Sequence, residues 1–281
     1  MARTDGRKPT DLRELSIVYE RLDRVDGAAK FGFGETKSLA SVSGPIEVRA
    51  NLELPSQATL DIHIRPLASI SGTDSKALST TLKGILSPAL LLSHHPRTLV
   101  QIVGQALCGT GSGSGMGSVG RGWNASLVAS VVNASSAALV NASSVPMRGV
   151  VCAVAVGRIP SESGLELVLD PSEAEISRLS GGGCFAFLFS AVLPSGTRDA
   201  PSGSLLWTNY TTNTPFDEAE LKRARELAEG GAREVWKTLK ESVGTMDASH
   251  ATTVRKTKAE PEVMEENASY AEDSDDAKME I

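Results

Sequence analysis

The sequence predicts an α+β domain, because short alternating or β-branched runs are interspersed with long helical stretches. Residues 58–65 alternate apolar and polar side chains, which is typical of a strand with one buried face. Residues 125–142 form a run of mainly Ala, Val, Leu and Ser that predicts a buried helix. Hydrophobic residues make up 41% of the chain and aromatic residues only 4%, so we expect a mainly aliphatic core.

The expected elements follow one another as strands, a helix, a strand, a buried helix, further strands and a final long helix. Strands are predicted over residues 15–20, 29–33, 37–42, 46–53, 58–65, 97–107, 150–156, 165–169, 184–192 and 205–209. The other two helices are predicted over residues 74–93 and 216–243, where apolar residues recur at helical spacing. Residues 109–122 hold seven glycines in fourteen positions and are expected to form a flexible loop.

Charge is distributed unevenly and sets the expected domain boundary. Residues 246–281 carry ten acidic and four basic side chains, so we expect a disordered acidic tail there. Residues 1–245, which we expect to fold as one domain with the glycine-rich insertion 109–122, carry 24 of each sign. A neutral body argues against a free-standing nucleic-acid binder with a broad basic face.

The cysteines and the composition of the chain indicate its compartment. Cys108, Cys152 and Cys184 are far apart and show no CxxC spacing, so we expect buried free thiols rather than a disulfide framework. We expect neither a metal site nor a cofactor. The start of the chain is polar and charged, and we expect no apolar run that approaches membrane-spanning length. A cytosolic or nuclear protein is therefore predicted.

Several short motifs resemble one protein family. An Asp-Gly-Arg at residues 5–7 is followed by Asp-Gly at 26–27, Gly-x-Thr at 34–36 and Gly-Pro at 44–45. This pattern resembles the RNase PH family. A His-Pro-Arg-Thr-Leu block at residues 95–99 narrows the resemblance to exosome core subunits of eukaryotes. Over roughly residues 3–243 the resemblance implies an α+β RNase PH-like fold (ribosomal protein S5 domain 2-like), with mixed sheets packed against helices.

Active members of the family hold phosphate through a Gly-(Ser/Gly)-Thr-Arg element at the start of the central helix. The resemblance places Leu127 at the Thr position and Val128 at the Arg position. Aliphatic side chains neither donate hydrogen bonds to an anion nor balance its charge. We therefore interpret Leu127 and Val128 as a degenerate phosphate site.

The resemblance also implies a pair of aspartates shortly after the Leu169-Asp170 turn, at the start of the next strand. No Asp occurs between Pro171 and Arg198, and the strand begins with Gly183-Cys184. Glu173 and Glu175 are expected on the solvated side of a short helical turn, and Asp170 is expected to form the turn. No catalytic residue is therefore predicted.

Arg65 and Arg97 are the candidate RNA-binding residues, because both lie in blocks that match the family. The position of Arg97 resembles that of an arginine that contacts phosphate or the RNA backbone in active relatives. The alternative for each is an arginine paired to a carboxylate or carbonyl at a subunit contact. Backbone contacts of this kind would be independent of sequence and would weaken with salt.

The resemblance implies a non-catalytic subunit of the RNA exosome core, which supports 3′-to-5′ RNA processing and degradation in the nucleus, nucleolus and cytoplasm. Its partners would be other RNase PH-like subunits in a six-membered ring, RNA-binding cap subunits, a separate nuclease, and RNA in the channel. One alternative is an active phosphate-dependent exoribonuclease with a displaced site. A second is a regulatory RNA-binding protein that acts outside the ring, through its acidic tail.

Overall fold

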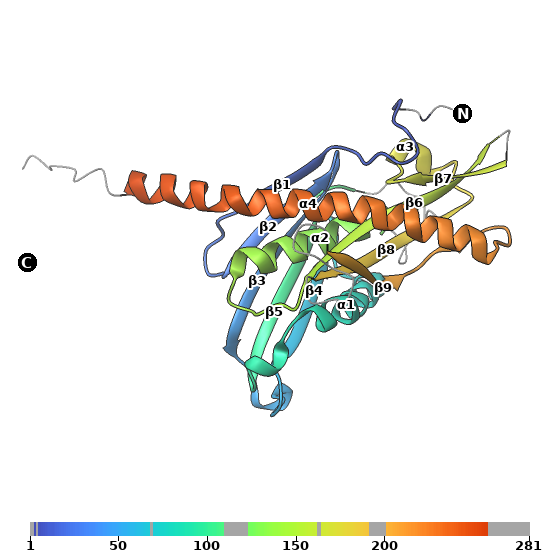
Figure 1. Cartoon of the computed structure of the whole chain (residues 1–281). Coiled ribbons are helices and arrows are strands. Elements are labelled where there is room, and N and C mark those ends of the chain that lie inside the picture. Colours follow the sequence, from blue (N-terminus) through green and yellow to red (C-terminus); the bar gives the residue numbers. More distant parts are fainter. Residues whose placement is uncertain are drawn as a thin grey trace, which may run out of the picture. The chain divides into compact units, whose positions relative to one another are not determined.

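The computed structural model (Figure 1) describes Arg3 and residues 5–67, 70–109, 123–161, 164–190 and 201–257. The chain divides into two compact units, Met1–Met246 and Asp247–Ile281. Most of the predicted glycine-rich loop, residues 110–122, and most of the predicted acidic tail, residues 258–281, lie outside the described residues. The elements of the first unit form two sheets and their helices.

The first sheet is built from the first half of the chain. Its strands are β1 (Leu15–Tyr19), β2 (Gly27–Phe33), β3 (Thr36–Glu47), β4 (Thr59–Arg65) and β5 (Thr98–Ala106), in the spatial order β1-β2-β3-β5-β4. The β2–β3 turn uses Gly34 with φ of 55°, a conformation that glycine adopts at little cost. Strand β4 runs parallel to β5, which requires a crossover that helix α1 (Thr73–Leu86) supplies.

The second sheet comes from the second half of the chain. Its strands are β6 (Val150–Ser161), β7 (Gly164–Leu169), β8 (Gly181–Ser190), β9 (Ser202–Thr208) and β10 (Thr211–Thr212). The spatial order is β10-β8-β6-β7, and β9 also pairs with β8. The short helix α3 (Glu173–Ile176) joins β7 to β8, and α4 (Glu218–Thr257) follows β10. The predicted α+β fold class is confirmed.

Helix α2 (Ala125–Ala142) packs against strands of both sheets and is buried on almost every side. Its polar side chains are satisfied internally: Asn133 bonds both backbone groups of Ala153, at 2.7 and 2.8 Å, and the Ser136 hydroxyl donates to Val151 O at 2.6 Å. By length and composition this described helix could span a membrane, yet 83% of it is buried in the domain. The expectation that no apolar run approaches that length was therefore wrong.

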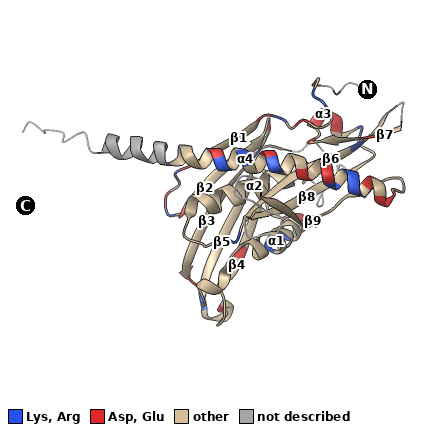
Figure 2. Cartoon of the chain, viewed as in Figure 1, with Lys and Arg blue, Asp and Glu red and all other residues tan. Residues whose placement is uncertain are grey.

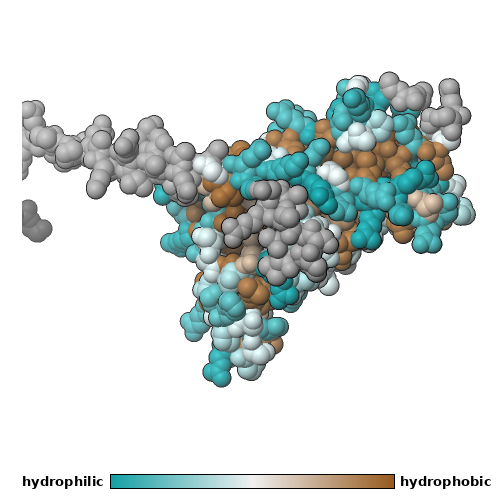
Figure 3. Space-filling view, in the orientation of Figure 1, coloured by the Kyte–Doolittle hydropathy of each residue, from teal (hydrophilic) through white to brown (hydrophobic). Residues whose placement is uncertain are grey.

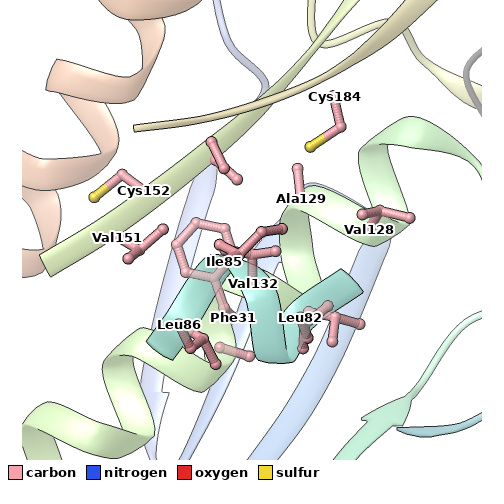
Figure 4. Packing of buried hydrophobic residues seen from close by; sticks show 14 of the residues in the cluster. Phe31, Leu82, Ile85, Leu86, Val128, Ala129, Val132, Val151, Cys152 and Cys184 are labelled. Atoms are coloured by element: carbon pink, nitrogen blue, oxygen red, sulfur yellow. The ribbon is translucent and has the colours of Figure 1, made fainter. Parts of the chain in front are cut away.

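The core around α2 is mainly aliphatic, as predicted, and also holds five phenylalanines. Figure 4 shows Phe31, Leu82, Val132 and Val151 converging in it. Cys152 and Cys184 are free and fully buried, which confirms the prediction for these two thiols, whereas Cys108 is half-buried. Burial raises the pKa of both buried thiols, so neither is a reactive nucleophile at neutral pH.

Three predicted elements differ from the structure. Residues 46–53 are not a separate strand, because β3 continues through Pro45 to Glu47 and a 3₁₀ turn covers Ala50–Leu52. Helix α1 ends at Leu86 and is followed by a 3₁₀ turn over Ser87–Ala89 that contains Pro88. Helix α4 runs on to Thr257 rather than ending at Val243, so the first residues of the predicted tail are helical.

Candidate functional site

The start of helix α2 is the place where the resemblance expects phosphate. Leu127 and Val128 have exposed fractions of only 1% and 0%, and both belong to the hydrophobic core; Figure 4 shows Val128 among the buried residues. The backbone amide of Leu127 donates to Asn124 Oδ1 at 2.7 Å, so the helix is capped by its own chain. Neither the two side chains nor this amide are free to hold an anion.

A cavity of about 330 Å³ lies beside this helix end. Its lining includes one cation, Arg13, and the carboxyl groups of Glu35 and Glu173. Asn124, Ser126 and the half-buried Cys108 contribute polar groups. Two carboxylates against one arginine give the lining a negative balance, which disfavours a phosphate ion.

Arg13, the cation of this cavity, is held by Asp170. Its Nε and Nη2 donate to Oδ2 and Oδ1 of Asp170 at 2.7 and 2.6 Å, and its Nη1 donates to Thr36 Oγ1 at 2.9 Å. Asp170 is fully buried and has φ of 47°, so it forms the turn as predicted. The sequence reasoning missed its second role, which is a two-pronged ion pair that occupies the guanidinium of Arg13.

A second arginine, Arg3, forms a similar pair. It belongs to the N-terminal arm, the segment of Arg3 and residues 5–14 that precedes β1. Arg3 Nε and Nη2 donate to the carboxylate of Glu175 at 3.1 and 2.9 Å, and Nη1 donates to Leu169 O at 2.9 Å. Figure 2 shows acidic residues of α3 beside basic residues of the arm. Burial alone would raise the pKa of Glu175, but hydrogen bonds from Arg3 lower it below its ordinary value. Arg3 therefore fastens the arm to α3.

The expectation for Glu175 was wrong. Glu173 is exposed, as predicted, but Glu175 has an exposed fraction of 1%. Its carboxylate also accepts from the amide of Ser172 at 2.9 Å, which completes a capping box at the start of α3. The partner, Arg3, lies 172 residues away along the chain, so no local pattern could have indicated the pair.

The start of strand β8, where the family pattern expects a carboxylate, has no room for a side chain. A Cβ atom added at Gly181 would lie 2.5 Å from Thr212, and one at Gly183 would lie 2.6 Å from Tyr210. At Gly182, with φ of 154°, the carbonyl oxygen of Val156 would be 2.7 Å away. The Thr212 side chain and the backbones of Val156 and Tyr210 lie too close to these three glycines for a carboxylate.

Arg65 and Arg97 lie at opposite ends of the parallel strands β4 and β5. Arg65 pairs in register with Gln105 near the end of β5, whereas Arg97 precedes the first residue of β5. At about 3.3 Å per residue, roughly 25 Å of strand separates them. The cavity includes Cys108, just beyond β5, so it lies at the Arg65 end. The structure does not bring the two arginines into one site.

The surroundings of these two arginines also differ. Arg97 Nε lies 3.3 Å from a carboxylate oxygen of Glu53, while its side chain keeps 70% exposure. Arg65 is exposed and makes no ion pair with any residue that the structure describes. Both side chains are accessible to a partner, and the Glu53 contact of Arg97 lies within this chain rather than at a subunit contact.

Other candidate groups do not form a site. His63 Nε2 lies 3.0 Å from Asp61 Oδ2 on the exposed side of β4. Across the described ranges, no three His, Cys, Asp or Glu side chains are grouped to hold a metal ion.

The comparisons with known proteins agree with this architecture. Residues 11–144 match the model of the 3′ exoribonuclease family RNase PH, domain 1. An exosome complex exonuclease RRP46 homolog from rice is 33% identical over 201 residues, which is 72% of this chain and 74% of the rice protein. The chain belongs to the RNase PH family. The predicted RNase PH-like fold is confirmed.

Solved structures show how far the likeness to other family members extends. The crystal structure of rice Rrp46 superposes with a TM-score of 0.68 at 25% identity, covering 86% of this chain and all of the rice chain. A chain of the Archaeoglobus fulgidus exosome with RNA bound to the active site superposes with a TM-score of 0.62 at 16% identity, covering 84% of this chain and 92% of the archaeal chain. The second comparison shows the shared RNase PH fold alone.

Proposed function

We propose that this chain is a non-catalytic RNase PH-like subunit of an RNA exosome core ring. The observation that carries the proposal is the state of the α2 start: Leu127 and Val128 are buried in the core, and the guanidinium of Arg13 is bound to Asp170. Phosphorolysis needs free cationic and N–H donors around the attacking phosphate, and a positioned acid or base. Among the described residues that line the cavity at this place, the one cation, Arg13, is already bound to Asp170.

The subunit would contribute to 3′-to-5′ RNA processing and degradation through assembly and through the lining of a channel. Its partners would be other RNase PH-like subunits, RNA-binding cap subunits and a separate nuclease, in the nucleus, nucleolus and cytoplasm. The similarity to RRP46 proteins supports this assignment. The exposed side chains of Arg65 and Arg97 would touch the RNA backbone, and the neutral charge of residues 1–245 suits a protein whose surface meets neighbours.

An active phosphate-dependent exoribonuclease is the second candidate. The printed name of the rice relative calls it an exonuclease, and the cavity of about 330 Å³ could admit a phosphate ion. In this case Arg13 would have to exchange Asp170 for phosphate, which would leave the buried carboxylate with only Arg7, 4.0 Å away, as a charged partner.

A phosphorolysis assay separates the two candidates. The purified full chain and the reconstituted ring are incubated with RNA and inorganic phosphate, and release of nucleoside diphosphates is measured. We expect no phosphate-dependent release from the chain, and no change in the activity of the ring when Arg13→Lys is introduced. Release that requires phosphate and disappears in the Arg13→Lys chain would show that the second candidate is correct.

A further inference from the structure

Strand β7 forms an edge of the second sheet, where it pairs with β6. The amide of Asp170 donates toward β6, to Ala155 O at 2.8 Å, whereas the amide of Leu169 donates the other way, to Pro9 O at 2.7 Å. Because backbone groups alternate in direction along a strand, the amides and carbonyls of Leu165 and Leu167 also point away from β6. Pro160, which has no N–H, lies opposite Leu165, as this alternation requires.

The chain already uses one end of this edge to bind its own N-terminal arm, through a turn at Pro9 and the side chain of Arg3. Pro9 O and the guanidinium of Arg3 take up the amide and the carbonyl of Leu169. Two and four residues further along, Leu167 and Leu165 offer the same groups, and no other described strand or segment bonds them. The side chain of Leu165 is 52% exposed. This is the open part of a pairing edge that the N-terminal arm fills at its other end.

A groove of about 750 Å³ runs beside the open edge. Leu165 and Leu167 form one wall, and Phe216, just before α4, and Leu227 of α4 form the other. Leu169 lies on the same face of β7, where it meets Gly231 of α4 so closely that an added Cβ would lie 2.6 Å from it. Helix and strand are thus in contact at the arm end of β7. Figure 3 shows hydrophobic surface on this side of the molecule.

The charged groups of the groove are of two kinds: those at its floor are paired with one another, and those at its rim face the solvent. In the floor, Arg158 Nη2 donates to Glu220 at 3.2 Å, and the Tyr210 hydroxyl donates to the same carboxylate at 2.7 Å. At the rim stand the carboxylates of Glu166 and Asp217 and the guanidinium of Arg223. Because the floor is internally paired, the rim alone faces an incoming chain, and it carries one net negative charge.

We propose that the open edge of β7 and this groove bind an extended segment of a neighbouring subunit, which adds to the sheet as a strand. The segment carries apolar side chains at alternate positions, and these fill the groove between β7 and α4. A basic residue in the segment faces Glu166. The bonds are made to the amides and carbonyls of Leu165 and Leu167, as in other cases of strand addition. The inference rests on the proposed function, because the occupant belongs to the assembled complex.

Amide hydrogen exchange on the full chain, free and in the reconstituted ring, tests the proposal. In the free chain, the amides of Leu165 and Leu167 exchange fast, whereas those of Glu166 and Val168 are bonded to β6 and exchange slowly. In the ring, we expect the first two to slow by at least about tenfold, as for amides that gain a backbone hydrogen bond. The second two serve as internal controls and stay slow in both states.

The outcomes of this experiment separate a failure of strand addition at β7 from a failure of the proposed function. If the ring forms and the amides of Leu165 and Leu167 still exchange fast, strand addition at β7 is wrong while the proposed function stands. If size-exclusion chromatography shows that the chain enters no ring, the proposed function and this inference both fall. Slowed exchange at Leu165 and Leu167 together supports the inference.

A pair of variants tests the bonds themselves. Leu167→Pro removes the outward amide and leaves the bonds to β6, whereas Leu167→Ala shortens the side chain and keeps the amide. We expect Leu167→Pro to weaken incorporation into the ring about tenfold, and more than Leu167→Ala does. Thermal unfolding of the free variants shows whether each is folded. Equal incorporation of folded Leu167→Pro and wild-type chains would overturn the proposal.

Discussion

The arginines of the N-terminal arm and the arginines at the ends of β4 and β5 differ in burial, partners and accessibility. Arg3 and Arg13 each grip a buried carboxylate with two nitrogens, and Arg3 is almost inaccessible. Arg65 and Arg97 are open to solvent, and only Arg97 has a carboxylate partner among the described residues. Arginine thus forms buried ion pairs that stabilise the fold in one region, and it is a solvent-exposed residue in the other.

This difference decides which arginines can take part in function. A guanidinium that already satisfies a buried carboxylate can reach a phosphate only by leaving that carboxylate unpaired. An exposed guanidinium carries no such penalty. The guanidinium groups of Arg3 and Arg13 therefore stabilise the fold, and those of Arg65 and Arg97 are accessible to a partner.

The largest expected effect is on the buried pair. Replacing Arg3 with Ala leaves the buried carboxylate of Glu175 without its partner and should cost about 3–5 kcal/mol of the free energy of unfolding. The matched Arg97→Ala chain, which loses an exposed pair, should lose no more than about 1 kcal/mol. Denaturant unfolding of both chains measures the contrast. Equal losses would remove the distinction between the two regions.

The second-largest expected effect is a weakening of the buried Arg3–Glu175 pair at acid pH. The folded-state pKa of Glu175 is lowered from its ordinary value of 4.5, so its stabilisation is full above about pH 4.5 and is lost as pH falls through the lowered pKa. Thermal unfolding of wild type and Glu175→Gln between neutral and acid pH isolates this contribution. We expect the difference in melting temperature to shrink as pH falls. A constant difference would contradict the assignment.

A smaller effect is expected on RNA binding by the assembled ring. Arg65→Ala removes one backbone contact, which should weaken binding about two- to fivefold and reduce the salt dependence by about one phosphate contact. Binding is measured by fluorescence anisotropy at several salt concentrations. Lys83→Ala, on the exposed side of α1, is the control and should change nothing. If Arg65→Ala binds as tightly as wild type, this residue does not contact RNA.

The smallest expected effect is that of a glycine at Arg97; Asp170, which also lies in the left-handed region but forms a buried ion pair, provides the contrast. Arg97 has φ of 61° and Asp170 has φ of 47°. Arg97→Gly relieves backbone strain and loses only an exposed pair, so it should stabilise the chain by at most about 1 kcal/mol. Asp170→Gly relieves the same strain but leaves Arg13 without its partner and should destabilise the chain. Unfolding free energies of opposite sign are the expected result.

The sequence predicted the helices and strands whose positions follow from a local pattern of apolar and polar residues. The apolar run placed α2 over its observed residues, and alternation placed β4 within one residue at its start. The degenerate phosphate site could be located from motif spacing, although its function remains a prediction. The Arg3–Glu175 and Arg13–Asp170 pairs could not be foreseen, because each joins residues that meet only after both sheets are formed.

The Arg3 contact gives the first residues of the chain an influence far beyond their length. Proteolytic trimming of a purified sample up to Asp5 would remove a few polar residues and be barely visible by mass on a gel. It would nevertheless strip the counter-charge from Glu175, leave the carbonyl of Leu169 without its guanidinium donor and loosen the grip of the arm on α3. Batches of this protein that differ only in such clipping should therefore age and melt differently.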